Sequence, residues 1–181
     1  MKLHELPVGD NSPYEVNVVI EIPQGSSQRM EYDTRWGVFN LDRTLFSPLY
    51  YPYNYGFIPN TLYLDGDAID SLVLCNHPVP MGTVVNARPV GVLKMYDDKG
   101  PDDKVLCVFA NDPRYEQVRR LTDISEHRGK EIVHFFEVYK DLEDKTVDVE
   151  GWYPVDIDHD VIRKFTLSKQ GIGHMDNGIA F

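Results

Sequence analysis

The order of the hydrophobic patterns along this 181-residue chain limits the folds that it can adopt. Runs rich in Val and Ile, with partial alternation of apolar and polar residues, dominate the first 110 residues and predict strands. Segments with helical spacing come only afterwards. Strands followed by helices favour an α+β fold that is mainly β, with helices covering a barrel or curled sheet. The expected strands are 15–22, 29–33, 37–43, 84–97 and 105–110.

Three helices are expected in the later part of the chain. Asp112 and the following Pro113 form a good N-cap and first turn, which predicts a short helix over 113–121. The strongest helical pattern spans 123–143, and the pattern over 158–169 predicts a final helix. The apolar face of the long helix is expected to contain Ile132, Phe135, Phe136, Tyr139 and Leu142.

The charge composition narrows the possible partners. The chain has 29 Asp and Glu against 18 Lys and Arg, which gives a formal net charge of −11. Without a basic run, such a chain repels nucleic acid and anionic membranes and attracts cations. No signal peptide or membrane span is recognisable, so we expect one cytoplasmic domain over residues 1–181. Cys75 and Cys107 form no CxxC pair and are expected to be reduced, buried thiols.

Three aspartates, Asp65, Asp67 and Asp70, lie within six residues between two apolar segments. Like charges this close repel one another more strongly as water is excluded, so a cation should offset them. Gly66 permits a tight turn in which these carboxylates face one point. Such oxygen ligands suit Mg²⁺, Mn²⁺ or Ca²⁺. A solvated Asp-rich turn is the alternative interpretation.

A second acidic segment, 96–104, contains four aspartates and connects two expected strands. Taken alone, it is typical of a polar hairpin loop. If the sheet brings it beside Asp70, five or more carboxylates surround one pocket, and several divalent ions are needed to neutralise them. Several Mg²⁺ ions held by aspartates would indicate phosphoryl chemistry.

The basic and tyrosine side chains near these segments have two interpretations. Tyr139 and Tyr55, the latter in the Tyr-rich stretch 50–61, either fill the core or direct a hydroxyl into the site. No zinc spacing, P-loop, GxGxxG or Ser-His-Asp arrangement is recognisable. The basic residues that are either surface charges or donors to an anion are Arg29, Arg43, Lys104 and Lys140.

Eight motifs stand in order along the chain: VVIEIP, MEYD, LDR, YPYNYGFIPNT, DGDAID, RPVGVLKMYDDKGPDDK, HFFEVYKDLE and VEGW. Together they resemble the motifs of the soluble family I inorganic pyrophosphatases, in their short bacterial form. The resemblance covers Val16 to Trp152 and preserves the order and approximate spacing of the family's motifs. One such motif would carry little weight, whereas eight in order are specific.

The resemblance implies a five-stranded OB-type barrel flanked by helices, with a site at the barrel mouth. It implies hydrolysis of pyrophosphate to two orthophosphates with several Mg²⁺ ions, for which Mn²⁺ or Zn²⁺ could substitute. It also implies a homo-oligomer, with a hexamer favoured. The expected role is to pull biosynthetic reactions forward by removing their product.

The resemblance also implies roles for individual residues. Asp67 matches the general base that takes a proton from the attacking water, and Glu21 matches a supporting carboxylate at the edge of the site. The implied metal ligands are Asp65, Asp70, Asp97, Asp102 and Glu31. The implied phosphate-binding donors are Arg29, Arg43, Tyr55, Lys104, Tyr139 and Lys140.

The sequence departs from the family pattern in three respects. Ala68 replaces the usual Pro and Ser71 a small apolar residue; neither position supplies a ligand, so only turn rigidity should change. Arg29 replaces the usual Lys, which keeps the charge but changes the shape of the donor. The tail over about 170–181 does not align with the family.

Two other classes of protein remain open. A non-catalytic divalent-cation module explains the carboxylates but leaves the basic residues without a role. A single-strand nucleic-acid binder on an OB barrel would use the Tyr-rich stretch for stacking, but the net charge of −11 argues against it.

Overall fold

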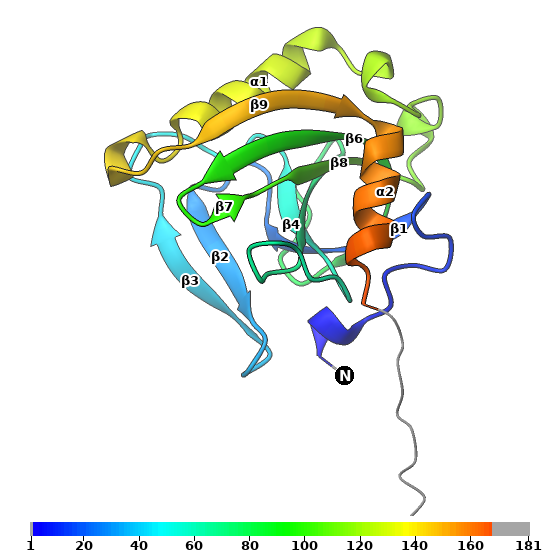
Figure 1. The fold of residues 1–181 in the computed structure, drawn as a ribbon, viewed down its shortest axis with the longest axis horizontal. Helices are drawn as coiled ribbons and strands as arrows, with labels where there is room; N and C mark the ends of the chain where they lie inside the picture. Colours follow the sequence, from blue (N-terminus) through cyan, green and yellow to red (C-terminus); the bar gives the residue numbers. More distant parts are fainter. Residues whose placement is uncertain (1, 168–181) are drawn as a thin grey trace, which may run out of the picture.

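The computed structural model describes residues 2–167, which form a mainly β fold with few helices (Figure 1). Five strands pair into a closed ring, because the last strand returns to the first. All neighbouring pairs in this ring are antiparallel except β5 and β8, which run parallel. In ring order the strands are β1 (Val16–Ile22), β4 (Asn54–Ile58), β5 (Ile69–Leu74), β8 (Lys104–Phe109) and β6 (Val84–Asp97).

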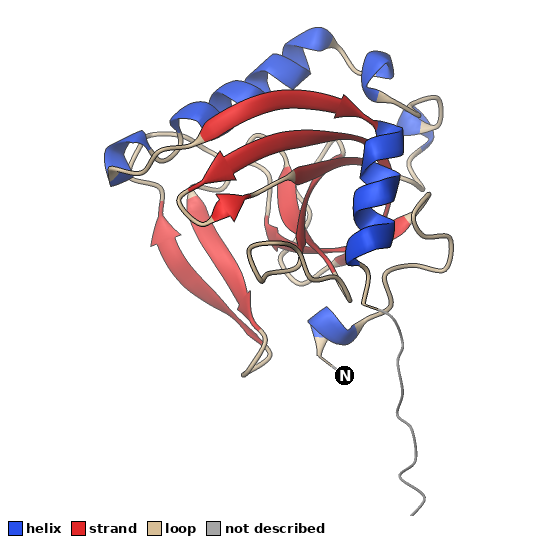
Figure 2. Ribbon diagram, in the orientation of Figure 1, coloured by secondary structure: helices blue, strands red, loops and turns tan. Residues whose placement is uncertain are grey.

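Four further strands lie outside the ring (Figure 2). The short β7 (Gly100–Pro101) and β9 (Asp148–Pro154) pair with β6 and extend its sheet. By contrast, β2 (Gln28–Asp33) and β3 (Val38–Thr44) pair only with each other among the described residues, as a hairpin that projects from the ring. This hairpin therefore has to be held by side chains and loops rather than by a shared sheet.

Two helices cover different apolar faces of the strands. Helix α1 (Glu126–Val138) packs on the cluster that contains Leu72, and α2 (Val155–Phe165) contributes Ile162 to the cluster that contains Val73. Leu72 and Val73 are neighbours on β5, and successive side chains of a strand point to opposite faces. The short 3-10 turns of the described chain are η1 (Leu3–Glu5), η2 (Pro113–Tyr115), η3 (Leu121–Asp123) and η4 (Asp141–Glu143).

The strands agree closely with the sequence patterns. β6 has the predicted bounds, and β1, β2, β3 and β8 lie within one residue of the prediction at each end. β4 and β5 do not follow from alternation, because both are buried on both faces over nearly their whole length. A strand covered on both faces lacks the period-two pattern that identifies a half-exposed strand.

The predicted helix over 113–121 is wrong, since only η2 and the separate η3 form in this region. The predicted cap does form: Asp112 Oδ1 accepts a hydrogen bond of 3.0 Å from the N–H two residues on. Beyond this turn, Arg88 donates to the carbonyl oxygens of Tyr115 at 2.7 Å and Val118 at 3.1 Å, and Tyr115 O also accepts from Val118 N at 3.0 Å. A longer helix would need such carbonyls for its own N–H donors.

The later helices differ from the prediction at their ends. α1 begins after its Ser125 cap and ends at Val138, and η4 follows. Leu142 lies in η4 and is 62% exposed, so its assignment to the apolar face is wrong. α2 begins three residues before its predicted start, while its predicted last residues, 168–169, lie outside the described part of the chain, as does the 170–181 tail.

The two cysteine predictions have different outcomes. Both thiols are free, and Cys107 is buried, but Cys75 is partly exposed, so the prediction that both are buried is wrong for Cys75. Within residues 2–167, none of the helices has the length and apolar character that a membrane crossing requires.

The close approach of β1 and β4 depends on Gly56. A Cβ there would lie 1.9 Å from Val19 O and 2.9 Å from Ile20 Cα. Gly56→Ala must therefore push the two strands apart, and we expect it to lower the free energy of unfolding in urea by at least about 2 kcal/mol. Gly129→Ala in α1 is the control, because its Cβ would meet only Trp152, at 3.4 Å. Because Ala has a higher helix propensity than Gly, Gly129→Ala should be about 0.5–1 kcal/mol more stable than the wild type. Equal losses of unfolding free energy in both variants would contradict this account.

Helix α2 also buries a carboxyl group that has no hydrogen-bond partner among the described residues. Asp158 is 0% exposed, and both of its side-chain oxygens are unpaired. Burial raises the pKa of Asp158 well above its usual range; the backbone of Gly91 opposes this rise, and the charge of Asp103 adds to it. The folded protein thus retains a proton that the unfolded chain releases. The associated stability is complete below the unfolded pKa and is lost as pH rises above it.

Asp158→Asn should remove this pH dependence while preserving the shape of the side chain. Above about pH 4, we expect the stability of the wild type to fall relative to the variant by up to about 1.4 kcal/mol per pH unit. Urea titrations over a pH series measure this slope. Asp156→Asn, which changes an exposed carboxylate on the same helix, is the control and should leave the slope unchanged. A difference between wild type and Asp158→Asn that stays constant with pH would contradict the prediction.

Candidate active site

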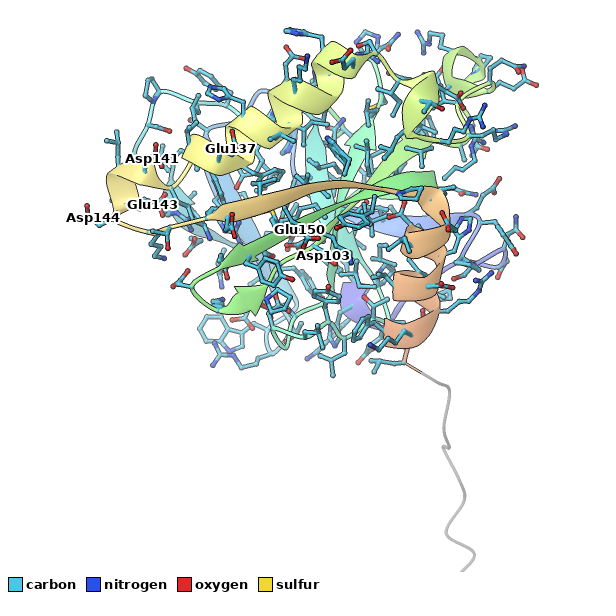
Figure 3. All side chains as sticks on the ribbon, turned by 45° about the horizontal axis from the view of Figure 1, so that its top comes forward. Asp103, Glu137, Asp141, Glu143, Asp144 and Glu150 are labelled. Carbon is cyan, nitrogen blue, oxygen red and sulfur yellow. The ribbon has the colours of Figure 1, made fainter. Side chains whose placement is uncertain are left out.

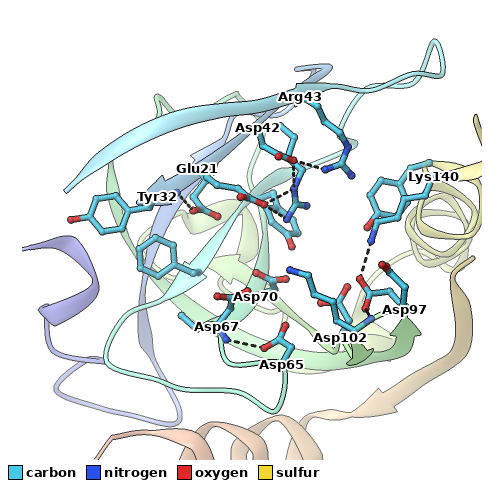
Figure 4. Close-up of a pocket in the computed structure, with 18 of the residues that line it drawn as sticks. Glu21, Tyr32, Asp42, Arg43, Asp65, Asp67, Asp70, Asp97, Asp102 and Lys140 are labelled. Carbon is cyan, nitrogen blue, oxygen red and sulfur yellow. Dashed lines mark hydrogen bonds and ion pairs between the residues drawn. The ribbon is translucent and has the colours of Figure 1, made fainter. Parts of the chain in front are cut away.

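The two acidic segments of the sequence meet in one pocket of about 320 Å³ (Figure 4). It lies between the β2–β3 hairpin, the β6–β7 connection, the end of α1 and the ring at β4 and β5. Asp65, Asp67 and Asp70 line it together with Asp97 and Asp102. The convergence that the sequence could only suggest is therefore present in the structure.

A buried lysine links the two acidic segments. β5 and β8 run parallel, and their register places Asp70 beside Lys104. The Lys104 Nζ donates to Asp70 Oδ2 at 2.6 Å and also to Asp102 Oδ1, and the lysine side chain is 2% exposed. Burying these three charges together is tolerable only because they are paired. The ammonium group offsets part of the repulsion between the two carboxylates, as a bound cation would.

The two partners of Lys104 differ in their pKa values. Burial by itself raises the pKa of Asp70, but the charge and hydrogen bond of Lys104 outweigh it, and the net pKa is lowered. Burial raises the pKa of Asp102 to about 6; the charge of Asp70 adds to this rise, and Lys104 opposes it. One ammonium group therefore does not compensate both carboxylates.

A tight turn before β5 presents Asp67 to the pocket. Tyr63 N donates to Asp67 O at 2.6 Å, and Gly66 has a φ of 93°, which favours glycine. Asp67 N donates to Asp65 Oδ1 at 3.0 Å, so the turn orients the Asp65 carboxylate. Burial and the neighbouring charge of Asp65 raise the pKa of Asp67. A raised pKa makes this carboxylate a better proton acceptor.

An ion pair joins the end of α1 to the end of β6. Lys140 Nζ lies 2.9 Å from Asp97 Oδ2, and the two side chains are 8% and 9% exposed. Burial acts to raise the pKa of Asp97, but the hydrogen bonds from Lys140 and from Lys99 N lower it overall. Asp97 is therefore ionised at neutral pH, and Lys140 brings a cation to the pocket from the end of α1.

The β2–β3 hairpin brings two arginines to the pocket. Arg29 and Arg43 are paired across the two strands, and both line the cavity. Asp42 Oδ2 lies 2.5 Å from Arg43 Nη1 and 3.5 Å from Arg29 Nε. Glu31 pairs with Arg29 at 2.8 Å. Carboxylates of the same hairpin thus hold both guanidinium groups.

The remaining predicted residues are at the same place. Tyr55 and Tyr139 line the pocket, and burial raises the pKa of both hydroxyls, so they stay protonated and can donate. Glu21 accepts a hydrogen bond of 2.8 Å from Tyr32 N and so ties the hairpin to the ring; burial raises its pKa to about 8. Every predicted site residue lines the pocket except Lys104, which contacts it through its two aspartates.

The structure adds three residues that the sequence analysis did not select. Asp42 adjoins Arg43 in the LDR motif, so its place beside the arginine offered a signal. Glu143 accepts from Arg43 Nε at 2.8 Å across 100 residues of sequence, and no pattern connects the two. His4 lines the pocket from η1, and its Nδ1 has no hydrogen-bond partner within the described chain.

Known proteins are similar to this chain in sequence and in fold. The family described as inorganic pyrophosphatase matches residues 18–169. An inorganic pyrophosphatase from Synechocystis sp. is 49% identical over 141 residues, which cover 78% of this chain and 83% of that protein. The crystal structure of inorganic pyrophosphatase from Thermus thermophilus has a TM-score of 0.89 and 44% identity, covering 92% of this chain and 97% of the other. The inorganic pyrophosphatase of Helicobacter pylori has a TM-score of 0.87 and 40% identity, covering 92% and 99%. On this evidence the chain belongs to the inorganic pyrophosphatase family.

Proposed function

We propose that this protein hydrolyses inorganic pyrophosphate to two orthophosphates with the help of divalent cations. The observation that carries the proposal is the meeting of two acidic segments with arginine, lysine and tyrosine donors in one pocket. Carboxylates alone would suit a cation module, and donors alone would suit an anion site. Both together suit an anionic substrate that binds with metal ions. The names of the relatives support the same activity.

The charge of the pocket fits divalent cations. Nine Asp and Glu side chains line it, against five Lys and Arg. Within residues 2–167, no three His, Cys, Asp or Glu side chains converge into a preformed metal site, since lysines and arginines hold several of the carboxylates. Lys104 is the only cation of the described chain that pairs with both Asp70 and Asp102, so two carboxylates share one ammonium group. Oxygen ligands of this kind favour Mg²⁺ or Mn²⁺, and the family resemblance adds Zn²⁺ as a further substitute.

The proposed ligands are the carboxylates that the family resemblance implies. Cations bound there would screen the charge of pyrophosphate and lower the pKa of the attacking water. They would also relieve Lys104 of its two aspartates, which frees its ammonium group to donate to a phosphate oxygen. The proposed metal ligands are Asp65, Asp70, Asp97, Asp102 and Glu31.

The proposed substrate donors differ in what they contribute. Arg29 and Arg43 can present two N–H groups to one phosphate, whereas Lys104 and Lys140 act as point charges. The buried hydroxyls of Tyr55 and Tyr139 add neutral donors. The positive charges of these arginines and lysines are held in place before substrate arrives. Little reorganisation is therefore needed when negative charge develops on the leaving phosphate.

Asp67 is the proposed general base. It lines the pocket next to the proposed ligands, and it forms no ion pair among the described residues, unlike Asp70 and Asp97. Partial burial and the charge of Asp65 raise its pKa, which makes the carboxylate a better proton acceptor.

The finer features of the assembly are proposals as well. The closed ring of five strands supports an OB-type barrel, and the family match over residues 18–169 supports a single domain. The free thiols of Cys75 and Cys107 are consistent with a cytoplasmic location. Trp36, Phe46 and Tyr50 are exposed by 62% or more, and subunit contacts in a hexamer could cover such residues.

Phosphate release from pyrophosphate tests the proposed activity. With excess Mg²⁺ at neutral to alkaline pH, we expect fast release that EDTA abolishes, and little release from ATP or a simple phosphate monoester. Metal binding in calorimetry without phosphate release would favour the cation module instead. Binding of single-stranded DNA at low salt would favour the nucleic-acid binder.

Asp67→Asn tests the assignment of the base. The amide cannot accept the proton, so we expect kcat to fall by roughly 10²–10⁴-fold. Calorimetry should still detect Mg²⁺ binding, because the proposed ligands remain. Asp160→Asn, at an exposed position on α2, is the control. Turnover of Asp67→Asn close to that of the wild type would rule out this residue as the base.

Sedimentation at about micromolar concentration tests the assembly. We expect the mass of an oligomer, with six copies favoured, because burying exposed apolar side chains stabilises association. A species with the mass of one chain under these conditions would contradict the proposal.

A further inference from the structure

A buried glutamate outside the pocket contacts one of the proposed phosphate-binding arginines. Glu143 Oε1 lies 2.8 Å from Arg43 Nε. The Glu143 side chain is 4% exposed, and the Arg43 side chain is 19% exposed. Arg43 lines the pocket, whereas Glu143 does not. Glu143 can therefore influence a bound substrate only through the guanidinium group that it holds.

The turn that carries Glu143 is fixed by its neighbours. Glu143 N donates to Lys140 O at 2.9 Å, and the Lys140 side chain is held in turn by Asp97. The next residue, Asp144, has a φ of 53°, which is uncommon for a residue other than glycine. Figure 3 labels Asp141, Glu143 and Asp144 on this turn at the end of α1. Of these three carboxylates, only Glu143 is not exposed.

Arg43 is held from two sides by different elements. Its Nε donates to Glu143, which follows α1, and its Nη1 pairs with Asp42 on the hairpin. Contacts to two nitrogens of a planar group set the orientation of its plane. The third nitrogen, Nη2, forms no hydrogen bond within residues 2–167, so a phosphate oxygen can accept from it without displacing Glu143.

We propose that Glu143 is a positioning residue for substrate binding. It holds the Arg43 guanidinium, and with it the β2–β3 hairpin, in the orientation that receives a phosphate group of pyrophosphate. The inference rests on the proposed function. The negative charge of Glu143 opposes an anionic substrate, so its contribution comes from orientation and not from charge.

Steady-state hydrolysis by Glu143→Ala and Glu143→Gln separates orientation from charge. Gln keeps an oxygen that can accept from Arg43 Nε but removes the charge, whereas Ala removes both. We expect the KM for pyrophosphate to rise about tenfold in Glu143→Ala, which is about 1.4 kcal/mol. The kcat of Glu143→Ala should stay within about threefold of the wild-type value. Glu143→Gln should keep a KM within about threefold of the wild type. Glu143→Asp, whose shorter side chain withdraws the oxygen, should raise KM as Ala does.

Two further variants complete the test. Asp141→Ala, an exposed carboxylate on the same turn, should leave KM and kcat unchanged. In an Arg43→Ala background, Glu143→Ala should raise KM no further, because the group that it positions is gone. The inference would be overturned if KM were unchanged or lowered in Glu143→Ala and Glu143→Asp. It would also be overturned if the Ala and Gln variants at Glu143 had equal effects on KM, or if the effects of Glu143→Ala and Arg43→Ala on KM were additive. A wild-type protein that does not hydrolyse pyrophosphate would overturn the proposed function instead.

Discussion

The ion pairs of Lys104 with Asp70 and Asp102 hold together the charged end of the strand ring. A buried ammonium group lies there within hydrogen-bond distance of two partly exposed carboxylates. Removing both carboxylates would leave the Lys104 charge buried without compensation, which is strongly destabilising. The arrangement depends on the parallel pairing of β5 and β8, which starts both strands at the same end of the ring and places Lys104 opposite Asp70. The topology thus decides where the charge gathers.

Ion pairs between carboxylates and basic side chains organise the rest of the pocket as well. Lys140 is paired with Asp97, and Arg43 with Asp42 and Glu143, so several of the proposed donors are held by carboxylates in this structure. These pairs keep the donors close to their working positions at a tolerable electrostatic cost. Divalent cations that take over the carboxylates would release Lys104 and Lys140 for the substrate. Nine of the 29 acidic side chains of the chain line this pocket.

Local patterns predicted β1, β2, β3, β6 and β8, and the residues that the motifs selected lie together at one pocket. β6 is recognisable because Val, Leu and Met recur along its 14 residues on both sides of Pro89 and Gly91, and the aspartate segments are recognisable because like charges close together need an explanation. Contacts between distant segments could not be predicted. Arg88 contacts the carbonyls of Tyr115 and Val118 in the region where a helix is expected at 113–121, and Glu143 contacts Arg43 from a turn 100 residues away. Each depends on a partner that sequence spacing does not indicate.

A crystal structure of the protein crystallised with Mn²⁺ would test the central claim most directly, because anomalous scattering locates the metal ions directly. The claim is that the carboxylates at the mouth of the ring hold divalent cations, and that Lys104 partly compensates them until the cations bind. The account predicts Mn²⁺ bound by Asp70 and Asp102, with the Lys104 Nζ no longer bridging the two carboxylates. Lys104 still bridging both aspartates, with no metal in the pocket, would contradict it.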